Sequence, residues 1–268
     1  MNTSADILII DDEQVIIDAI LKICSLENYS AESALNVQAA IEKISRKYYS
    51  IIVCDIMMPD GDGFQILNEL RNQNSSSALI MMTGYSTVEN AVNSLYQGAV
   101  DFIPKPFTVD ELLSSVYRAI KYQDIKKKQA DISRKNTAHS LLYVACPAKY
   151  LSLGYSSWMH QESDGSVLIG VCDLFLKTIE SVKEIEFLKA DEETAQGICC
   201  VSIISGDERT HKVLSPISGR IIEVNQNLIL NTSIIEKDPY FEGWMYRVIP
   251  SDIEYETKNL VPYNSDRL

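Results

Sequence analysis

Five polar side chains in the first part of the chain have the types needed for phosphoryl chemistry. They are three carboxylates, a hydroxyl and an amine: Asp11, Asp12, Asp55, Thr83 and Lys105. Three carboxylates held together repel one another, and at least one keeps its proton unless a cation lies among them. Mg²⁺ suits such a site, because it uses few carboxylates, keeps waters and also binds phosphate. An ionised aspartate beside this metal can attack a phosphoryl group while the lysine and hydroxyl stabilise its oxygens.

These residues follow short apolar runs, which indicates the elements that position them. The runs Ile7–Ile10, Ile51–Cys54 and Leu79–Met82 are typical of strands buried on both faces, and the shorter run Asp101–Ile103 precedes Lys105. Segments between the runs carry apolar residues at helical spacing: Val15–Cys24, Val37–Ile44, Phe64–Leu70 and Val88–Leu95. This alternation predicts an α/β domain with a parallel sheet. Functional residues of such sheets gather beyond the carboxyl ends of the strands.

Charge divides the chain into three parts. Residues 1–122 and 141–268 each carry a net charge of −8, whereas residues 123–140 carry +3. Helical spacing continues from Val109 to Ile132, so we expect residues 123–140 to be a basic, helical linker on a solvated helix. A short helical seam that pairs two protomers is the alternative. After Leu141, short alternating strands with Gly and Pro between them predict a small, mainly-β domain.

Composition argues against several classes of protein. A net charge of −13 opposes nucleic-acid binding, and the second half lacks a basic recognition helix. No apolar run approaches the ~18 residues of a membrane span. The six cysteines form no C-x-x-C pair and the three histidines are scattered, which favours a reduced chain without a zinc site. No catalytic constellation follows residue 140. We therefore expect a cytoplasmic protein that is not an enzyme and binds neither nucleic acid nor membrane.

Four motifs in the first part resemble the receiver domain of two-component response regulators. IIDDE, IVCDIMMPDGDGF, MMTGY and DFIPKPF occur in the order and spacing of that family over about residues 5–122. The resemblance implies a flavodoxin-like, doubly wound domain with five parallel strands. It also implies that a sensor histidine kinase phosphorylates Asp55 in a phosphorelay.

The same resemblance implies how the metal is bound. Asp12 and Asp55 would ligate Mg²⁺ directly, Asp11 would act mainly through water, and the Met57 carbonyl would complete the protein ligands. Taken alone, an aspartate pair such as Asp11 and Asp12 is more often a helix N-cap than a metal site. Its occurrence together with the other motifs favours the metal site.

Further roles follow from the receiver resemblance. Thr83 and Lys105 would bind the phosphoryl oxygens, and the Lys105–Pro106 peptide bond would be cis. Phe102 would be an aromatic switch, although an aromatic side chain here could equally belong to the core. Met57 and Tyr85 would flank the path of the hydrolytic water, and neither orients water well. The sequence therefore predicts a phosphoaspartate that decays slowly.

Residues from about 143 to 262 resemble the H protein of the glycine cleavage system, a lipoyl carrier. The matching stretches are GYSSWMHQESDGSVLIGVCD and LSPISGRIIEVNQNLILNTSIIEKDPYFEGWMYRVIPSDI. The resemblance implies a barrel-like β-sandwich with the lipoyl-lysine at a hairpin tip, eight residues before Pro216. That position is Glu208, and a carboxylate cannot form the lipoyl amide, so lipoate is not expected. Lys212, four residues later, is either a surface strand lysine or a relocated carrier.

Two functional hypotheses remain at this point. In the first, the chain is a response regulator whose phosphorylation switches protein–protein contacts of a non-lipoylated, H protein-like output domain. In the second, it is a phosphorylation-regulated lipoyl carrier or a docking protein for lipoyl enzymes. A homodimer through the receiver or the linker helix is compatible with both.

Overall fold

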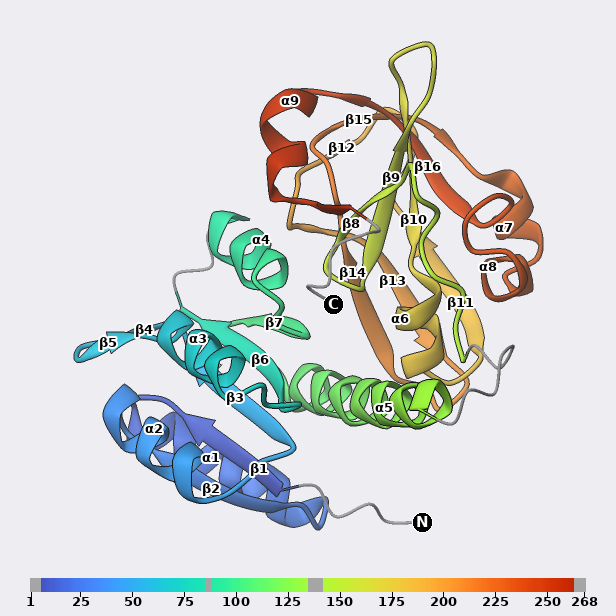
Figure 1. The fold of residues 1–268 in the computed structure, drawn as a ribbon. Helices are drawn as coiled ribbons and strands as arrows, with labels where there is room; N and C mark the ends of the chain where they lie inside the picture. Colours follow the sequence, from blue (N-terminus) through green and yellow to red (C-terminus); the bar gives the residue numbers. More distant parts are fainter. Residues whose placement is uncertain (1–5, 85–87, 135–141, 263–268) are drawn as a thin grey trace. The chain divides into compact units, whose positions relative to one another are not determined.

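The computed structural model describes residues 6–84, 88–134 and 142–262, which form two compact units (Figure 1). Met1–Ser86 and Gln97–Lys127 make up the first unit, and Thr87–Tyr96 with Lys128–Leu268 the second. Helix α4 (Val88–Tyr96) therefore groups with the second unit. Among the described residues, no helix has both the length and the apolar character of a membrane span.

The first unit is built on a five-stranded parallel sheet with the strand order β2-β1-β3-β6-β7. Its strands are β1 (Asp6–Ile10), β2 (Ser30–Ala34), β3 (Ile51–Asp55), β6 (Ala78–Thr83) and β7 (Asp101–Pro104). Its helices are α1 (Gln14–Leu26), α2 (Val37–Arg46), α3 (Phe64–Asn72) and most of α5 (Val109–Arg134), and a small hairpin pairs β4 (Met57–Met58) with β5 (Gly61–Asp62). This is the flavodoxin-like, doubly wound order, and it confirms the predicted fold class.

Apolar side chains on both faces of the sheet hold this unit together. Leu8 and Ile52 pack in one core with residues of α2 and α3, and the alternate residues Ile7, Ile9 and Val53 are also fully buried. Successive strand residues point to opposite faces, so the continuous apolar runs are explained by helices on both sides. The sheet is thereby rigid enough to fix the side chains at its strand ends.

The rest of the second unit is mainly β, as the sequence predicts. One antiparallel sheet has the order β12-β15-β16-β10-β9-β8-β17, and a smaller one the order β11-β13-β14. The first contains β8 (Leu151–Leu153), β9 (Ser157–Gln161), β10 (Val167–Val171), β12 (Glu193–Thr194), β15 (Gly219–Val224), β16 (Trp244–Pro250) and β17 (Val261–Pro262). The second contains β11 (Val182–Phe187), β13 (Cys199–Ser205) and β14 (Thr210–Leu214). Short helices complete the unit: α6 (Asp173–Thr178), α7 (Gln226–Leu230), α8 (Ser233–Lys237), α9 (Ile253–Glu256) and η1 (Thr257–Asn259).

Buried aromatic residues organise the β-rich core. Trp158 is fully buried, and its indole N–H is shared between the carbonyls of Val171 (3.0 Å) and Pro239 (3.2 Å). Tyr246 of β16 is also fully buried, and its hydroxyl donates to the Cys200 carbonyl on β13 at 2.9 Å. Since β16 and β13 belong to different sheets, this bond ties the two sheets together. The polar groups of both buried side chains, the Trp158 indole N–H and the Tyr246 hydroxyl, thus have hydrogen-bond partners, as buried Trp and Tyr usually do.

Candidate functional site

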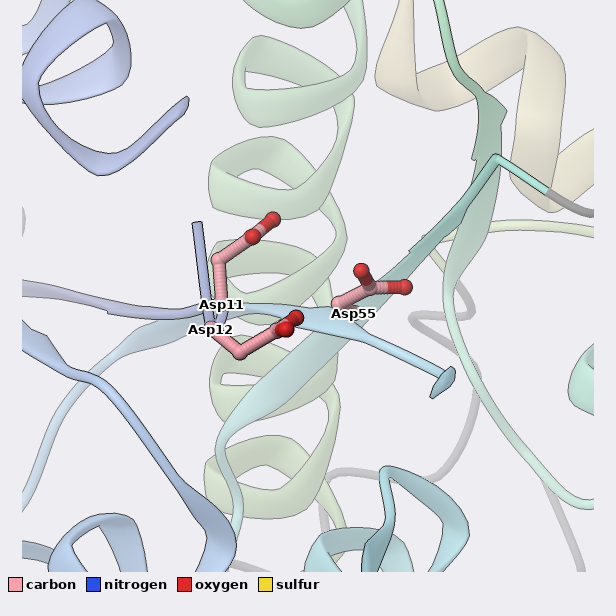
Figure 2. Close-up of side chains that lie close together, drawn as sticks. All are labelled: Asp11, Asp12 and Asp55. Carbon is pink, nitrogen blue, oxygen red and sulfur yellow. The ribbon is translucent and has the colours of Figure 1, made fainter. Parts of the chain in front are cut away.

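Three carboxylates meet at the carboxyl ends of β1 and β3 (Figure 2). Asp11 and Asp12 directly follow β1, and Asp55 is the last residue of β3. Each offers an oxygen, and these oxygens all lie within 4.8 Å of one another. Because β1 and β3 are parallel neighbours, their carboxyl ends emerge side by side, which brings together acids 44 positions apart.

Lys105 lies among these acids and partly neutralises them. Its ammonium is 2.6 Å from an Asp55 oxygen and 2.7 Å from an Asp11 oxygen. The preceding strand β7 pairs with β6, and the Lys105 amide donates to the Thr83 carbonyl at 2.8 Å. The Lys105–Pro106 peptide is cis, as the receiver resemblance implies. The position of this ammonium is therefore fixed from the main chain as well as by the two carboxylates.

Burial sets the electrostatics of the site. Asp11 is fully buried, and burial raises the pKa of its carboxyl although Lys105 and the Glu13 amide oppose the change. Burial alone would lower the pKa of Lys105, but hydrogen bonds to Asp11 and Asp55 reverse this effect and raise it. A raised carboxyl pKa means that the protein disfavours the ionised form. A second cation would stabilise the ionised carboxylates and relieve that penalty. The residues of this site therefore fit a bound Mg²⁺ ion.

The remaining predicted residues lie around this cluster. Thr83 ends β6 and is fully buried, whereas Met57 is 54% exposed two residues beyond Asp55. The Met57 amide donates to Asp55 at 3.2 Å. Phe102 on β7 is half-buried and packs against the core shared with α2 and α3, so its ring has both core contacts and solvent access. Tyr85 lies outside the described residues.

Two residues at the site were not singled out from the sequence. Glu13 is exposed, directly precedes α1, and places a carboxylate oxygen 3.8 Å from the Lys105 ammonium. Gly63 lies against the Asp55 main chain so closely that a Cβ atom there would overlap the Asp55 carbonyl oxygen. Both occur within quoted motifs, as the third acid of IIDDE and the last glycine of PDGDGF. The motif letters alone do not give their contacts.

The hairpin β13–β14 of the second unit contains the other candidate position. Glu208 lies at its tip with φ of 63°, is exposed, and forms an ion pair with Lys183 of β11. Lys212 lies within β14 with its residue exposed to solvent, as expected for a surface strand lysine. Beneath the tip, the buried Ser205 hydroxyl is 3.0 Å from His211 Nε2. The hairpin therefore ends in a solvent-exposed turn, and Glu208 is an acidic residue on that turn.

The strand-end arrangement has the parts of a phosphoryl-accepting site. It combines an accessible acid (Asp12), a nearly buried acid (Asp55, 5% exposed) and a fixed ammonium. The transition state of phosphoryl transfer spreads charge over three oxygens, so catalysis depends on placed cations and donors. This fold and site define a receiver of the two-component type.

Comparison with known families extends this assignment to both units. Residues 7–117 match the response regulator receiver domain, and residues 149–266 match the glycine cleavage H-protein family. The chain therefore contains a response regulator receiver domain followed by a domain of the glycine cleavage H-protein family.

Individual relatives match one region at a time. The regulatory protein AtoC of Escherichia coli is 35% identical over 46% of this chain, which spans 26% of AtoC. NtrX of Brucella abortus, solved with ATP, is 31% identical over 48% of this chain and 30% of its own, with a TM-score of 0.47. A glycine cleavage system H protein from Mycobacterium marinum is 23% identical over 39% of this chain and 86% of its own, with a TM-score of 0.37. The chain thus spans about a quarter to a half of the length of the curated regulators that it matches.

Proposed function

We propose that this protein is a two-component response regulator that accepts a phosphoryl group on Asp55 from a sensor histidine kinase. Phosphorylation then switches protein–protein contacts of the H protein-like domain. The observation that carries the proposal is the meeting of Asp11, Asp12 and Asp55 within 4.8 Å, with the Lys105 ammonium bonded to Asp55. The receiver family of residues 7–117 supports the same activity.

Each residue of the site has a role in this proposal. Asp12, Asp55 and the Met57 carbonyl would hold Mg²⁺, and Asp11 would act through water. When bound, Mg²⁺ offsets the negative charge of the acids and of the incoming phosphate. An Asp55 oxygen attacks the phosphorus as the bond to the kinase imidazole breaks, and that imidazole leaves. Lys105 stabilises the phosphoryl oxygens from its fixed position.

Two further residues connect the reaction to a response. The Thr83 hydroxyl donates to a phosphoryl oxygen, and this contact draws the end of β6 inward. Phe102 lies on the neighbouring strand β7 and is only half-buried, so its ring has room to reorient. Phosphorylation thereby shifts a two-state equilibrium instead of adding a contact alone.

The H protein-like domain acts as a binding module in this proposal. Glu208 at the hairpin tip cannot form a lipoyl amide, and its ion pair with Lys183 gives the acid a place in the fold. A net charge of −8 over residues 141–268 favours a protein partner over nucleic acid. We further propose that the protein acts in the cytoplasm and that its receiver or linker helix forms a homodimer.

The experiment compares the partners captured by three forms of the full chain. These are the unphosphorylated protein, the protein with BeF₃⁻ and Mg²⁺ as an acyl-phosphate mimic, and Asp55→Ala treated identically. We expect a partner set that changes with BeF₃⁻ in the wild type and does not change in Asp55→Ala. Asp18→Asn, which removes an exposed acid on α1, should behave as the wild type. Identical partner sets in all forms would contradict phosphorylation control.

The carrier alternative has its own test. Intact-mass measurement of protein isolated from cells should show no lipoyl group on this chain. A lipoyl increment mapped to Lys212 would replace the binding-module proposal by the carrier hypothesis, while leaving phosphorylation at Asp55 intact.

A further inference from the structure

Two cysteines from separate segments of the second unit lie beside one another. Cys172 is the N-cap residue of α6 and is only 4% exposed. Cys146 lies in the segment that follows the linker, is half-buried, and packs against the aromatic cluster that contains Cys172. Both thiols are free, and the Cys146 side chain lies close enough to Cys172 to affect the pKa of its thiol. Cys146 also precedes residues 149–266, so it lies outside the part that matches the H-protein family.

The main chain next to Cys146 is held in place by a small hydrogen-bond network. The Val144 amide donates to the Asp173 carboxylate at 2.6 Å, and the Tyr240 hydroxyl donates to the Val144 carbonyl at 2.9 Å. The Asp173 amide donates to the same hydroxyl at 3.1 Å. Because Asp173 directly follows Cys172, this network aligns the two cysteine segments. The approach of the thiols is therefore a property of the fold and not of one flexible side chain.

The two thiols differ in how they meet solvent. Burial, reinforced by the hydrogen bond to Cys146, raises the pKa of the Cys172 thiol well above its ordinary value. Cys172 therefore stays protonated and shielded from bulk oxidants. Cys146 retains solvent access, and the thiolate is the form that reacts with peroxides. Oxidation thus starts at Cys146, with Cys172 placed to resolve it.

We propose that Cys146 and Cys172 are an oxidation-sensitive modification site that forms an intramolecular disulfide with hydrogen peroxide as the oxidant. The Cys146 thiolate attacks one peroxide oxygen, the O–O bond breaks, and the leaving oxygen takes up the proton that Cys146 released, giving water and a sulfenic acid. The Cys172 sulfur then attacks the sulfenic sulfur of Cys146. The sulfenic hydroxyl takes up the Cys172 proton and leaves as water. Two thiols and one peroxide become one disulfide and two waters.

The disulfide would fasten the start of the H protein-like domain to the N-terminus of α6. In the reduced chain, hydrogen bonds from Val144 and Tyr240 and the packing of Cys146 against the aromatic cluster hold this segment without a covalent link. A covalent link closes the loop from residue 146 to residue 172 and restricts the unfolded chain. The oxidised protein should therefore unfold at a higher temperature than the reduced protein, and this effect does not depend on phosphorylation.

The experiment treats the reduced full-length protein with hydrogen peroxide, blocks remaining thiols with N-ethylmaleimide and maps peptides without reductant. We expect a cross-linked peptide joining residues 146 and 172, an intact mass lower by about 2 Da before blocking, and reversal by dithiothreitol. The midpoint of thermal unfolding should rise on oxidation and fall again on reduction.

Matched variants make the result specific. Cys146→Ser, at a half-buried position, should abolish the cross-link and the thermal shift, whereas Cys199→Ser, also half-buried, should retain both. Circular dichroism of the reduced proteins checks that each variant is folded. Peroxide treatment that yields only over-oxidised Cys146, or cross-links between chains, would overturn the proposal. An unchanged thermal shift in Cys146→Ser would do the same.

Discussion

The strand-end site of the receiver and the hairpin tip of the H protein-like domain place their acidic residues in opposite environments. At the strand ends, the buried acids Asp11 and Asp55 contact one ammonium, and burial raises the pKa of Asp11. At the hairpin tip, Glu208 is exposed and paired with Lys183. The first arrangement carries an electrostatic cost that a bound Mg²⁺ ion would relieve, whereas the exposed, paired acid at the tip carries no such cost. Burial, and not the presence of an acid as such, therefore sets the electrostatic cost at the two positions.

Replacing the acid at the tip should have the largest effect, because the variant should gain a covalent lipoyl group that the wild-type protein is expected not to carry. With a lipoate–protein ligase, lipoate and ATP, Glu208→Lys should gain one lipoyl group by mass spectrometry, since the hairpin already presents position 208. Arg209→Lys is the matched control and should remain unmodified. Equal labelling of both variants, or of neither, would contradict the assignment of position 208 as the carrier position.

Crowding the strand-end site should be the next largest effect. Gly63→Ala places a methyl group against the Asp55 carbonyl oxygen, so the β5–α3 loop or the end of β3 must shift. We expect the phosphorylation rate from acetyl phosphate, followed on phosphate-affinity gels, to fall about 100-fold. Gly84→Ala, next to Thr83 but with no atom within 4 Å of the added Cβ, should stay within about threefold of wild type. Equal losses in both variants would remove the steric explanation.

A substitution that destabilises the core of the H protein-like domain should leave phosphorylation of the receiver unchanged. Tyr240→Phe removes the hydroxyl that bonds Val144 and Asp173, leaving the buried Asp173 amide without this partner at a cost of about 2 kcal/mol. Urea unfolding should report this loss, while the phosphorylation rate stays the same. Tyr255→Phe, at a 62% exposed position, should change stability by less than about 0.5 kcal/mol. A slower phosphorylation in Tyr240→Phe would mean that the two regions are not independent.

The lifetime of the phosphoryl group should depend on the exposed Met57. An amide at this place can orient the attacking water, so Met57→Asn should speed loss of phosphate about tenfold, or about 1.4 kcal/mol in the barrier. The measurement is the decay of labelled phosphoprotein after removal of the donor. Met57→Leu keeps an apolar side chain and should decay as the wild type does; faster decay there would point to a packing effect.

The smallest effect concerns an ion-pair network away from the site. Hydrogen bonds from Lys47, Lys43 and Tyr49 lower the pKa of Glu32 to about 2. Because the folded pKa lies below the ordinary 4.5, the carboxylate stabilises the fold above that pH, and the contribution fades as pH falls toward 2. Glu32→Gln should therefore lose less than about 1 kcal/mol at pH 7 and less still at pH 3. Urea titrations test this, with Glu42→Gln as the exposed control; a deficit that grows at acid pH would contradict it.

Much of the receiver could be predicted from the sequence because its central strands are buried on both faces. The continuous apolar runs identify β1, β3 and β6, but not the edge strand β2, whose sequence SAESA is partly exposed and pairs only with β1. The acids at the ends of β1 and β3 followed from the rule for parallel sheets. Thr83 was expected after its strand and instead ends it, a shift of one residue.

Contacts between residues far apart in the sequence could not be predicted in the same way. No spacing rule links Cys146 to Cys172, because their approach depends on how Tyr240 and Asp173 hold the segment around Val144, just before Cys146. By contrast, the alternation of residues along a strand explains why Cys199 is half-buried and its neighbour Cys200 is buried. Local periodicity gives the orientation of side chains, whereas tertiary packing decides their partners.

The buried indole of Trp158 also gives the two regions different optical signatures. Both tryptophans of the chain, Trp158 and Trp244, lie in the H protein-like domain, and Trp158 is fully shielded from water. Fluorescence excited at the red edge of the absorption band therefore reports on that domain alone, while the receiver contributes only tyrosine. A change in this emission when Asp55 is phosphorylated would show, without any attached label, that the receiver's state has reached the output domain.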